Sequence, residues 1–386
     1  GYNDGVIDSL DRYAKIRGQI SIVADKDGWE AGAAAGPYQD YFQGPIVADF
    51  GEDPLTFEAD DANVHSFEPE DFDVSGFRDM TDSDLATQVS SNLATADGSP
   101  DDPVAGGQVF EEVPYGSANP YDYFDRPVYE NMTFTNVFIP KGTNALFRNC
   151  TFIGMTFIET ATDNGDVNYN YAGIQDATGA LVHPDKTAVV DGATLADTKT
   201  VANNIRFDSC KFEGAIVTDS APNYTHVRNK LTFTGLTDFD VEGSTNLTAN
   251  EKALFRRSTL LAPHYSIEFG TFVDPNNPNE RIELSGTIVA GILDMRGQVK
   301  VNGTVLMTFE PVSNTGPVIG ETSPQFNTTL GYFSDDDGDL EADEIPANGL
   351  GVIQVIYDET LPLPDGILGP IEILPVMATY MEGGAR

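Results

Sequence analysis

Carboxylates crowd one short segment near the C-terminal end of the chain, and their spacing is the pattern best suited to chemistry. Residues 334–344 read Ser-Asp-Asp-Asp-Gly-Asp-Leu-Glu-Ala-Asp-Glu. Hard oxygen ligands on alternate residues can wrap around one Ca²⁺ ion. A solvated loop is the alternative, because acidic runs are common in so acidic a chain. The expected cofactor is Ca²⁺, and the expected ligands are Asp335, Asp337, Asp339, Glu341, Asp343 and Glu344.

This acidic segment resembles the calcium loop of EF-hand proteins, which also alternates oxygen ligands around a Gly. It departs from the full loop because Gly338 comes early and no helix clearly precedes it. The resemblance implies a bound ion at these positions and gives no reaction.

Catalytic arrangements do not stand out elsewhere. The chain has no Gly-x-Ser-x-Gly, P-loop or dinucleotide fingerprint. The histidines show no ligand spacing such as His-x-x-x-His; they are His65, His183, His226 and His264. We therefore expect a protein that is not an enzyme, with no catalytic residues and no organic cofactor.

Two cysteines occupy the same position in an internal repeat. Residues 147–157 and 207–217 share the pattern Phe-x-x-Cys-x-Phe-x-Gly-x-x-apolar, which contains Cys150 and Cys210. Neighbouring strands lie about 4.8 Å apart, within the Cα separation that a disulfide accepts. We expect two small buried residues stacked on adjacent coils. A disulfide that pins the coils together is the alternative.

The repeat also predicts the fold class. Short copies with large apolar residues every five positions indicate neighbouring coils of a β-solenoid, also called a β-helix. We expect a mainly β protein with a solenoid core, long loop insertions, an irregular N-terminal region with about one helix, and a C-terminal β cap. The expected divisions are 1–127, 128–310 with an insertion at about 159–202, and 311–386.

A second periodic run supports this architecture. Between residues 282 and 309, glycines separate short alternating segments of the kind found in strands; they are Gly286, Gly291, Gly297 and Gly303. Each Gly would permit a sharp corner or a positive φ. The run predicts short strands that turn at each Gly.

Local patterns predict individual elements. Leu85, Val89 and Leu93 predict a helix over 81–94, and Thr248 with Glu251 forms a capping-box signature for a second helix. We expect short strands at 19–23, 45–48, 55–57, 132–139 and 351–357. The Gly-, Pro- and Asp-rich segment 95–125 predicts an irregular wrap.

Net charge excludes some partners. The formal charge is −40, from 61 acidic and 21 basic residues. Such a surface repels nucleic acid and anionic membranes, because binding them needs clustered Lys and Arg. It is compatible with high salt concentration or with divalent cations, because these ions screen the repulsion between negatively charged copies. No run of 18 apolar residues is present, so we expect no membrane span.

Three resemblances extend this interpretation. The five-residue spacing of Phe147, Phe152 and Phe157 resembles pentapeptide-repeat β-helices, and the glycine run resembles bactofilin-type solenoids. Longer phrases resemble exported planctomycete-type proteins with a pilus-assembly-like anchor and a β-rich ectodomain; these phrases are residues 142–152, 224–231, 286–291, 306–309, 326–333 and 363–366. The last resemblance implies an extracellular or cell-surface location.

The expected function is therefore non-catalytic. We expect a structural or adhesive surface protein, as a subunit of a filament or of a pilus-associated structure, whose partners are further copies, other surface or pilus proteins, or glycans. A polysaccharide-active β-helix enzyme, a lyase or glycosidase, is one alternative, since many β-helices act on sugars with paired carboxylates. A pilus assembly factor or minor pilin is another.

Overall fold

The computed structural model describes residues 74–114, 121–161, 200, 203–220, 229–271 and 281–307, with short strands at 14–17, 20–23, 46–47, 55–58, 329–332 and 353–356. Three helices lie among these residues: α2 (Ser75–Arg78), α3 (Leu85–Leu93) and α5 (Ala249–Arg257). The strands are β1 (Ala14–Arg17), β2 (Ile20–Val23), β3 (Ile46–Val47), β4 (Leu55–Glu58), β5 (Ser83–Asp84), β6 (Val104–Pro114), β7 (Tyr121–Glu130), β8 (Thr133–Ile139), β9 (Leu146–Arg148), β10 (Thr151–Ile158), β11 (Asn204–Asp208), β12 (Lys211–Thr218), β13 (Lys230–Thr234), β14 (Asp238–Phe239), β15 (Leu260–Thr271), β16 (Ile282–Gly297), β17 (Val299–Met307), β18 (Thr329–Tyr332) and β19 (Ile353–Ile356).

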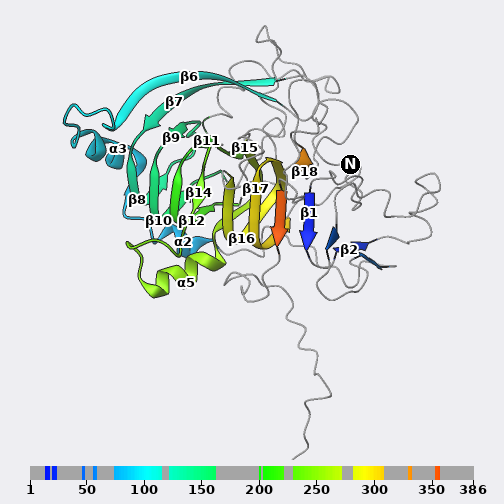
Figure 1. Ribbon diagram of the computed structural model, residues 1–386. Helices are drawn as coiled ribbons and strands as arrows, with labels where there is room; N and C mark the ends of the chain where they lie inside the picture. The colour runs from blue at the N-terminus through cyan, green and yellow to red at the C-terminus, as the bar shows by residue number, and fades with distance from the viewer. Residues whose placement is uncertain are drawn as a thin grey trace, which may run out of the picture.

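The expectation of a mainly β protein is confirmed, and nearly all strand pairs are parallel. Strands pair with the strand two places on in the sequence, so two ladders alternate along the chain (Figure 1). We call β8, β10, β12 and β14 the first ladder, and β7, β9, β11 and β13 the second ladder. This alternation places the two cysteine-containing repeats on neighbouring strands.

Both ladders continue through the longer strands. The N-terminal half of β15 pairs with β12 and its C-terminal half with β13, and β16 follows β15 along both ladders. Beyond β16, the first ladder runs through β17, β19, β1 and β3. Strands from the N-terminal region therefore lie next to β19, a strand of the expected C-terminal cap.

Two columns of phenylalanine fill the space between the ladders. In the first ladder, Phe152 stacks on Phe212, with ring centroids 4.9 Å apart. In the second, Phe207 stacks on Phe147 and on Phe233, at 5.4 and 5.3 Å. The columns meet edge to face, as between Phe152 and Phe207 at 5.5 Å. Edge-to-face and offset-stacked pairs are the favoured aromatic geometries, so each ring is stabilised by neighbours in both columns.

A left-handed corner precedes the strands of the first ladder. Asn131, Asn149 and Ser209 have φ values of 57°, 51° and 54°, and Gly235 has 62°. Only Gly, and to a lesser degree Asn, tolerates this region readily. Each corner ends one strand of the second ladder and lets the chain enter the first, so the equivalent positions turn at the same level of the repeat.

A second apolar cluster lies on the outer face of the first ladder. Phe157 belongs to it together with Met155, Val217, Phe77 of α2 and Phe255 of α5. The two helices therefore cover this face (Figure 1). The five-residue spacing therefore does not place Phe157 in the same core cluster as Phe152. Phe152 and Phe157 are an odd number of residues apart on one strand, so they project to opposite faces.

Helix α3 lies beside β8 at one end of the first ladder (Figure 1). It begins at Leu85, later than the sequence predicted, because Asp84 caps it by accepting a hydrogen bond from the Thr87 backbone N–H at 2.8 Å. Leu85 is buried in the same core cluster as the phenylalanine columns. Residues well before position 127 therefore share the core of the ladders.

Several local predictions are confirmed. Strands occur at the expected places near residues 20, 46, 55, 133 and 353. The helix α5 has the full capping box, in which Thr248 and Glu251 bond each other's backbone N–H groups.

The prediction of an irregular wrap over 95–125 is wrong. Residues 104–114 form β6, which pairs antiparallel with β7 in a long hairpin that we call the arm. Gly106, with a φ of 109°, sits at a register shift between Ala105 and Gly107. The glycine-rich stretch therefore forms a bulge inside a strand. The composition of this stretch alone does not distinguish a bulge from a loop.

The prediction of short strands that turn at each Gly between residues 282 and 309 is wrong. Residues 282–297 and 299–307 form two long strands, β16 and β17, which pair in register with Gly286 opposite Gly303. These two glycines have positive φ values of 139° and 153°. A Cβ on Gly303 would lie 1.8 Å from the Gly286 carbonyl oxygen, so close approach of neighbouring strands requires Gly there.

Candidate functional site

The predicted calcium ligands lie outside the described residues. This applies to Asp335, Asp337, Asp339, Glu341, Asp343 and Glu344, and also to most of the insertion between the two cysteine repeats. Within the described ranges, no group of three or more His, Cys, Asp or Glu side chains is arranged to hold a metal ion. No helix in the same ranges is long and apolar enough to cross a membrane.

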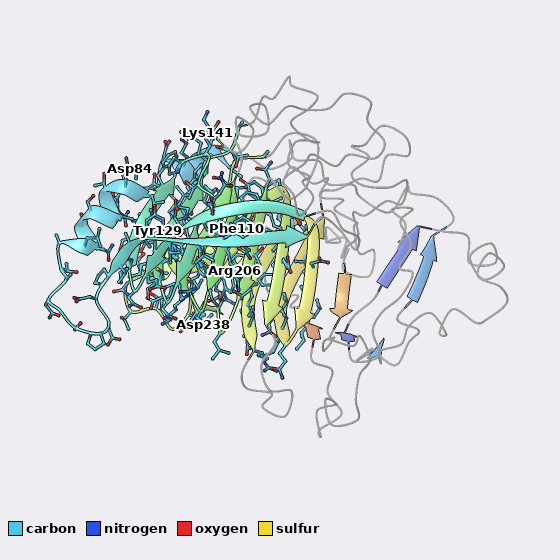
Figure 2. The ribbon with its side chains drawn as sticks, turned by 90° about the horizontal axis from the view of Figure 1, so that it is seen from above. Asp84, Phe110, Tyr129, Lys141, Arg206 and Asp238 are labelled. Carbon is cyan, nitrogen blue, oxygen red and sulfur yellow. The ribbon has the colours of Figure 1, made fainter. Side chains whose placement is uncertain are left out.

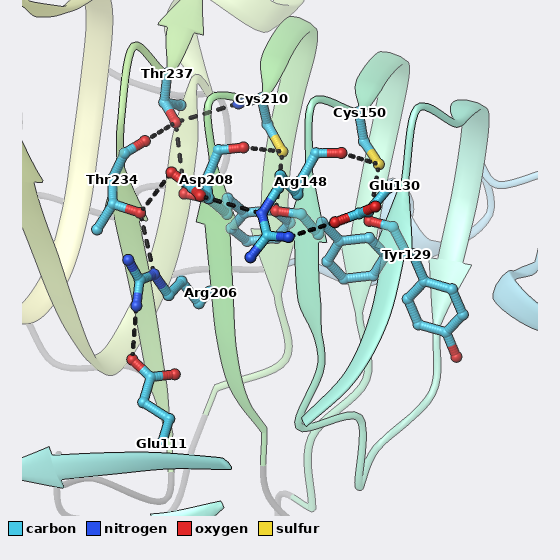
Figure 3. A network of polar contacts seen from close by, with 12 residues as sticks. Glu111, Tyr129, Glu130, Arg148, Cys150, Arg206, Asp208, Cys210, Thr234 and Thr237 are labelled. Carbon is cyan, nitrogen blue, oxygen red and sulfur yellow. Dashed lines mark hydrogen bonds and ion pairs between the residues drawn. The ribbon is translucent and has the colours of Figure 1, made fainter. Parts of the chain in front are cut away.

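Cys150 and Cys210 lie one residue before paired positions of β10 and β12, and both are buried, free thiols. The Cys150 thiol donates to the Tyr129 carbonyl, and the Cys210 thiol donates to the Phe147 carbonyl, both at 3.4 Å (Figure 3). Burial raises the pKa of Cys210 well above its ordinary value. A buried, protonated thiol that bonds a backbone carbonyl acts as part of the scaffold.

A strip of paired charges lies on the outer face of the second ladder. Arg148 on β9 forms ion pairs with Glu130 on β7 and with Asp208 on β11 (Figure 3). The Thr234 hydroxyl on β13 continues the strip by donating to Asp208 at 3.2 Å. Each of these residues comes from the next strand of the ladder, so the strip ties neighbouring strands together at one level of the repeat.

The arm is fastened over this strip by a buried guanidinium. Arg126 on β7 is 1% exposed and is ion-paired with Glu111 on β6. Its other nitrogens donate to the carbonyl and to the side-chain oxygen of Asn204 on β11, the latter at 2.6 Å. Glu111 also accepts from Arg206 of β11 at 3.0 Å. We call Arg126, Glu111 and Asn204, which the buried guanidinium joins, the latch.

Figure 2 shows that the arm crosses over the strands of the ladders, with Arg206 beneath it. Each of the three arginines in the strip and beneath the arm, Arg126, Arg148 and Arg206, forms an ion pair with a carboxylate of this chain. An anionic ligand would have to displace these carboxylates, so the arrangement fits a structural role better than anion binding.

Replacing Arg126 should loosen the arm. We expect Arg126→Met to lower the free energy of unfolding by about 2–3 kcal/mol, because hydrogen bonds to a buried charge are lost and their acceptors stay buried. Arg206→Met is the matched control, since its side chain is 33% exposed and pairs with the same carboxylate. Its expected loss is about 1 kcal/mol or less. Equal losses in urea unfolding of the two variants would contradict the latch.

A second polar cluster surrounds Glu213 on the opposite ladder. Its carboxylate accepts from Lys211 at 2.8 Å, from the Ser244 hydroxyl at 2.8 Å and from the Asn246 amide at 2.9 Å. Burial raises the pKa of Glu213, but these hydrogen bonds outweigh it and hold that pKa below the ordinary value. The carboxylate therefore stays ionised and anchors the segment between β14 and α5.

A pair of carboxylates lies at the ends of β10 and β12. Glu159 and Asp219 directly follow the paired residues Ile158 and Thr218. Glu159 forms an ion pair with Arg78 at 3.1 Å, and Asp219 accepts from the Thr160 backbone N–H at 3.0 Å. Burial raises the pKa of Asp219, and Glu159 adds to the rise while Arg78 and Lys141 oppose it.

The raised pKa of Asp219 predicts a specific pH dependence. Between the ordinary aspartate pKa and the raised folded value, the native state holds a proton that the unfolded state has released. Stability therefore falls as pH rises through that window, and it stays lower above it. We expect Asp219→Asn to remove this fall and to be more stable at neutral pH, because the amide oxygen still accepts from Thr160. An unchanged pH profile in thermal unfolding would contradict this assignment.

Sequence reasoning missed the latch and the carboxylate pair. Tyr121–Glu130 does carry a partial signal, because Phe124 and Val128 fall on alternate positions as in a half-buried strand, but Arg126 lies between them on the same buried face. The contacts of Arg126 with Asn204 join residues 78 positions apart, and local pattern gives no access to such pairs.

Comparisons with protein families, with curated proteins and with solved structures found no match to this chain.

Proposed function

We propose that the two parallel ladders are the walls of a β-solenoid, wound so that each coil contributes one strand to each ladder. The pairing of each strand from β7 to β14 with the strand two places on supports this winding. The corners at Asn131, Asn149, Ser209 and Gly235 are where the chain would turn from one wall to the other. The arm and the helices α2, α3 and α5 then decorate the outside of the coil.

The function that this arrangement supports best is a non-catalytic scaffold, displayed on the cell surface or outside the cell. The observation that carries the proposal is the pair of phenylalanine columns, which buries one ring per strand at matching levels of both ladders. Such regular stacking extends a rigid body in one direction, which suits structural or adhesive display. The latch, the buried thiols and the Glu213 cluster stabilise the same body.

The charge of the chain fits this role. A net charge of −40 would keep copies apart in dilute solution, and divalent cations would screen the repulsion. We propose that Ca²⁺ binds the acidic segment 334–344 through its alternate carboxylates. Calorimetric titration should then show saturable Ca²⁺ binding that is lost when Asp335, Asp337 and Asp339 are changed to Asn.

Immunogold electron microscopy of the cells that make the protein tests the proposed location and role. We expect label on the cell surface or on surface filaments, and elongated particles or assemblies when the purified chain receives Ca²⁺. Label confined to the cell interior, with a strictly monomeric compact particle, would overturn the proposal. Co-purification with pilus subunits in substoichiometric amounts would instead favour an assembly factor or minor pilin.

A polysaccharide-active enzyme is the second candidate, and the Glu159–Asp219 pair favours it. Glycosidases use one protonated carboxyl group and one ionised carboxylate, and burial raises the pKa of Asp219 beside Glu159. A screen on acidic and neutral polysaccharides tests this candidate. Turnover that Asp219→Asn abolishes would replace the scaffold proposal, and no turnover on any polymer would remove this alternative.

A further inference from the structure

Two side-chain amides of α3 bond the outer edge of β8. The Gln88 amide donates to the Thr135 carbonyl and accepts from the Thr135 N–H, both at 2.8 Å. The Asn92 amide does the same with Thr133, at 2.8 and 2.9 Å. Each amide thus presents one donor and one acceptor to one residue of β8, as the backbone of a neighbouring strand would.

The spacing of these residues explains how a helix can imitate a strand. Gln88 and Asn92 are four apart on α3, a rise of about 6.0 Å. Thr133 and Thr135 are two apart on β8, a rise of about 6.6 Å. The near match lets consecutive turns of the helix meet alternate residues of the strand. Met132 directs its carbonyl the other way, where it accepts from Thr151 of β10.

The remainder of the same edge is also occupied. Strand β5 pairs in parallel with Val137 and Phe138, and the Asp82 N–H donates to the Asn136 carbonyl at 2.7 Å. Residues 82–92 therefore cover the edge of β8 from Thr133 to Phe138. Native proteins cover edge strands because an open edge pairs with another chain.

We infer that α3 is a strand-mimicking end cap, and that Gln88 and Asn92 keep β8 from accepting an extended strand of a second copy of this chain. We choose a second copy as the partner because strands of this chain are known to pair in parallel with strands of the first ladder: β8, β10, β12 and β14 do so with one another. Without the amides, β8 would present the same row of backbone groups that β10 presents to β12. This role of α3 does not depend on where the chain is located.

The test replaces the two amides while keeping the helix. The variant Gln88→Leu with Asn92→Leu retains side chains of similar size that favour helix. Light scattering after size exclusion should find the unchanged protein as a single chain and the variant as a concentration-dependent series of larger species. Ser90→Ala with Ser91→Ala is the matched control, because both hydroxyls bond only backbone carbonyls within α3 and both residues are exposed. The control should stay a single chain.

Hydrogen exchange keeps the inference testable if the leucine variant does not fold. In the unchanged protein, the amide protons of Thr133 and Thr135 should exchange as slowly as that of Phe134. A folded leucine variant that stays a single chain at every concentration would overturn the inference. Fast exchange at Thr133 and Thr135 in the unchanged protein would overturn it equally, because the cap would then not hold the edge.

Discussion

Phe207→Ala should lower the free energy of unfolding by about 3–5 kcal/mol, the range measured for buried phenylalanines cut back to alanine. The ring of Phe207 is fully buried and stacks on Phe147 and Phe233 within its own column. It also meets Phe152 and Phe212 edge to face, at 5.5 and 5.1 Å. Removing it would open a cavity between both columns, which the rigid ladder strands are poorly able to fill.

Chemical denaturation measures this loss, and Phe110→Ala is its control. Phe110 lies on the arm and is 61% exposed (Figure 2). Its truncation removes the same atoms from a site largely in water, so we expect a change within about 0.5 kcal/mol. A loss at Phe207 no greater than that at Phe110 would mean that the columns do not carry the core.

Gly214→Ala should be nearly as damaging, through the backbone. Gly214 lies opposite Gly154 in the pairing of β12 with β10. A Cβ on Gly214 would come 1.8 Å from the Gly154 carbonyl oxygen and 2.6 Å from its carbon. The obstacle is backbone, so no side-chain rotation relieves it and the two strands must separate. We expect a loss of about 3 kcal/mol or more, at the upper end of overpacking effects.

Gly107→Ala controls for the loss of glycine itself. Its nearest neighbour would be Val128 at 3.6 Å, an ordinary contact. Reduced freedom of the unfolded chain should leave its stability unchanged or raise it by up to about 1 kcal/mol. If both alanine variants unfold at the same urea concentration as the unchanged protein, the close register of Gly154 with Gly214 is contradicted.

The part of the fold that sequence predicted rests on matched copies. Phe152 and Phe212 are equivalent in the two repeats, and they stack on paired strands. Gly154 and Gly214 are equivalent too, and their close approach explains why the repeat keeps Gly two residues after the Phe. Residues that recur at equal spacing must meet when copies stack, so the pattern itself carries this information.

The parts of the fold that the sequence did not predict depend on contacts between dissimilar segments. The arm was missed because Gly106 and Gly107 suggested a loop, whereas Gly106 forms a bulge within β6. Gln88 and Asn92 carry no sequence signal of capping, because the same spacing is ordinary on any exposed helix. Their partners on β8 lie 47 and 41 residues away, respectively. Burial of Asp219 likewise appears only once the ladders assemble.

A crystal structure of the chain would test whether the two repeats stack as parallel ladders around paired phenylalanine columns. We expect Thr151–Ile158 and Lys211–Thr218 to pair in parallel and in register, with the rings of Phe152 and Phe212 about 5 Å apart. This arrangement also places the ring of Phe207 edge-on between them. Antiparallel pairing of the two repeats, or Phe152 and Phe212 in separate parts of the molecule, would contradict it.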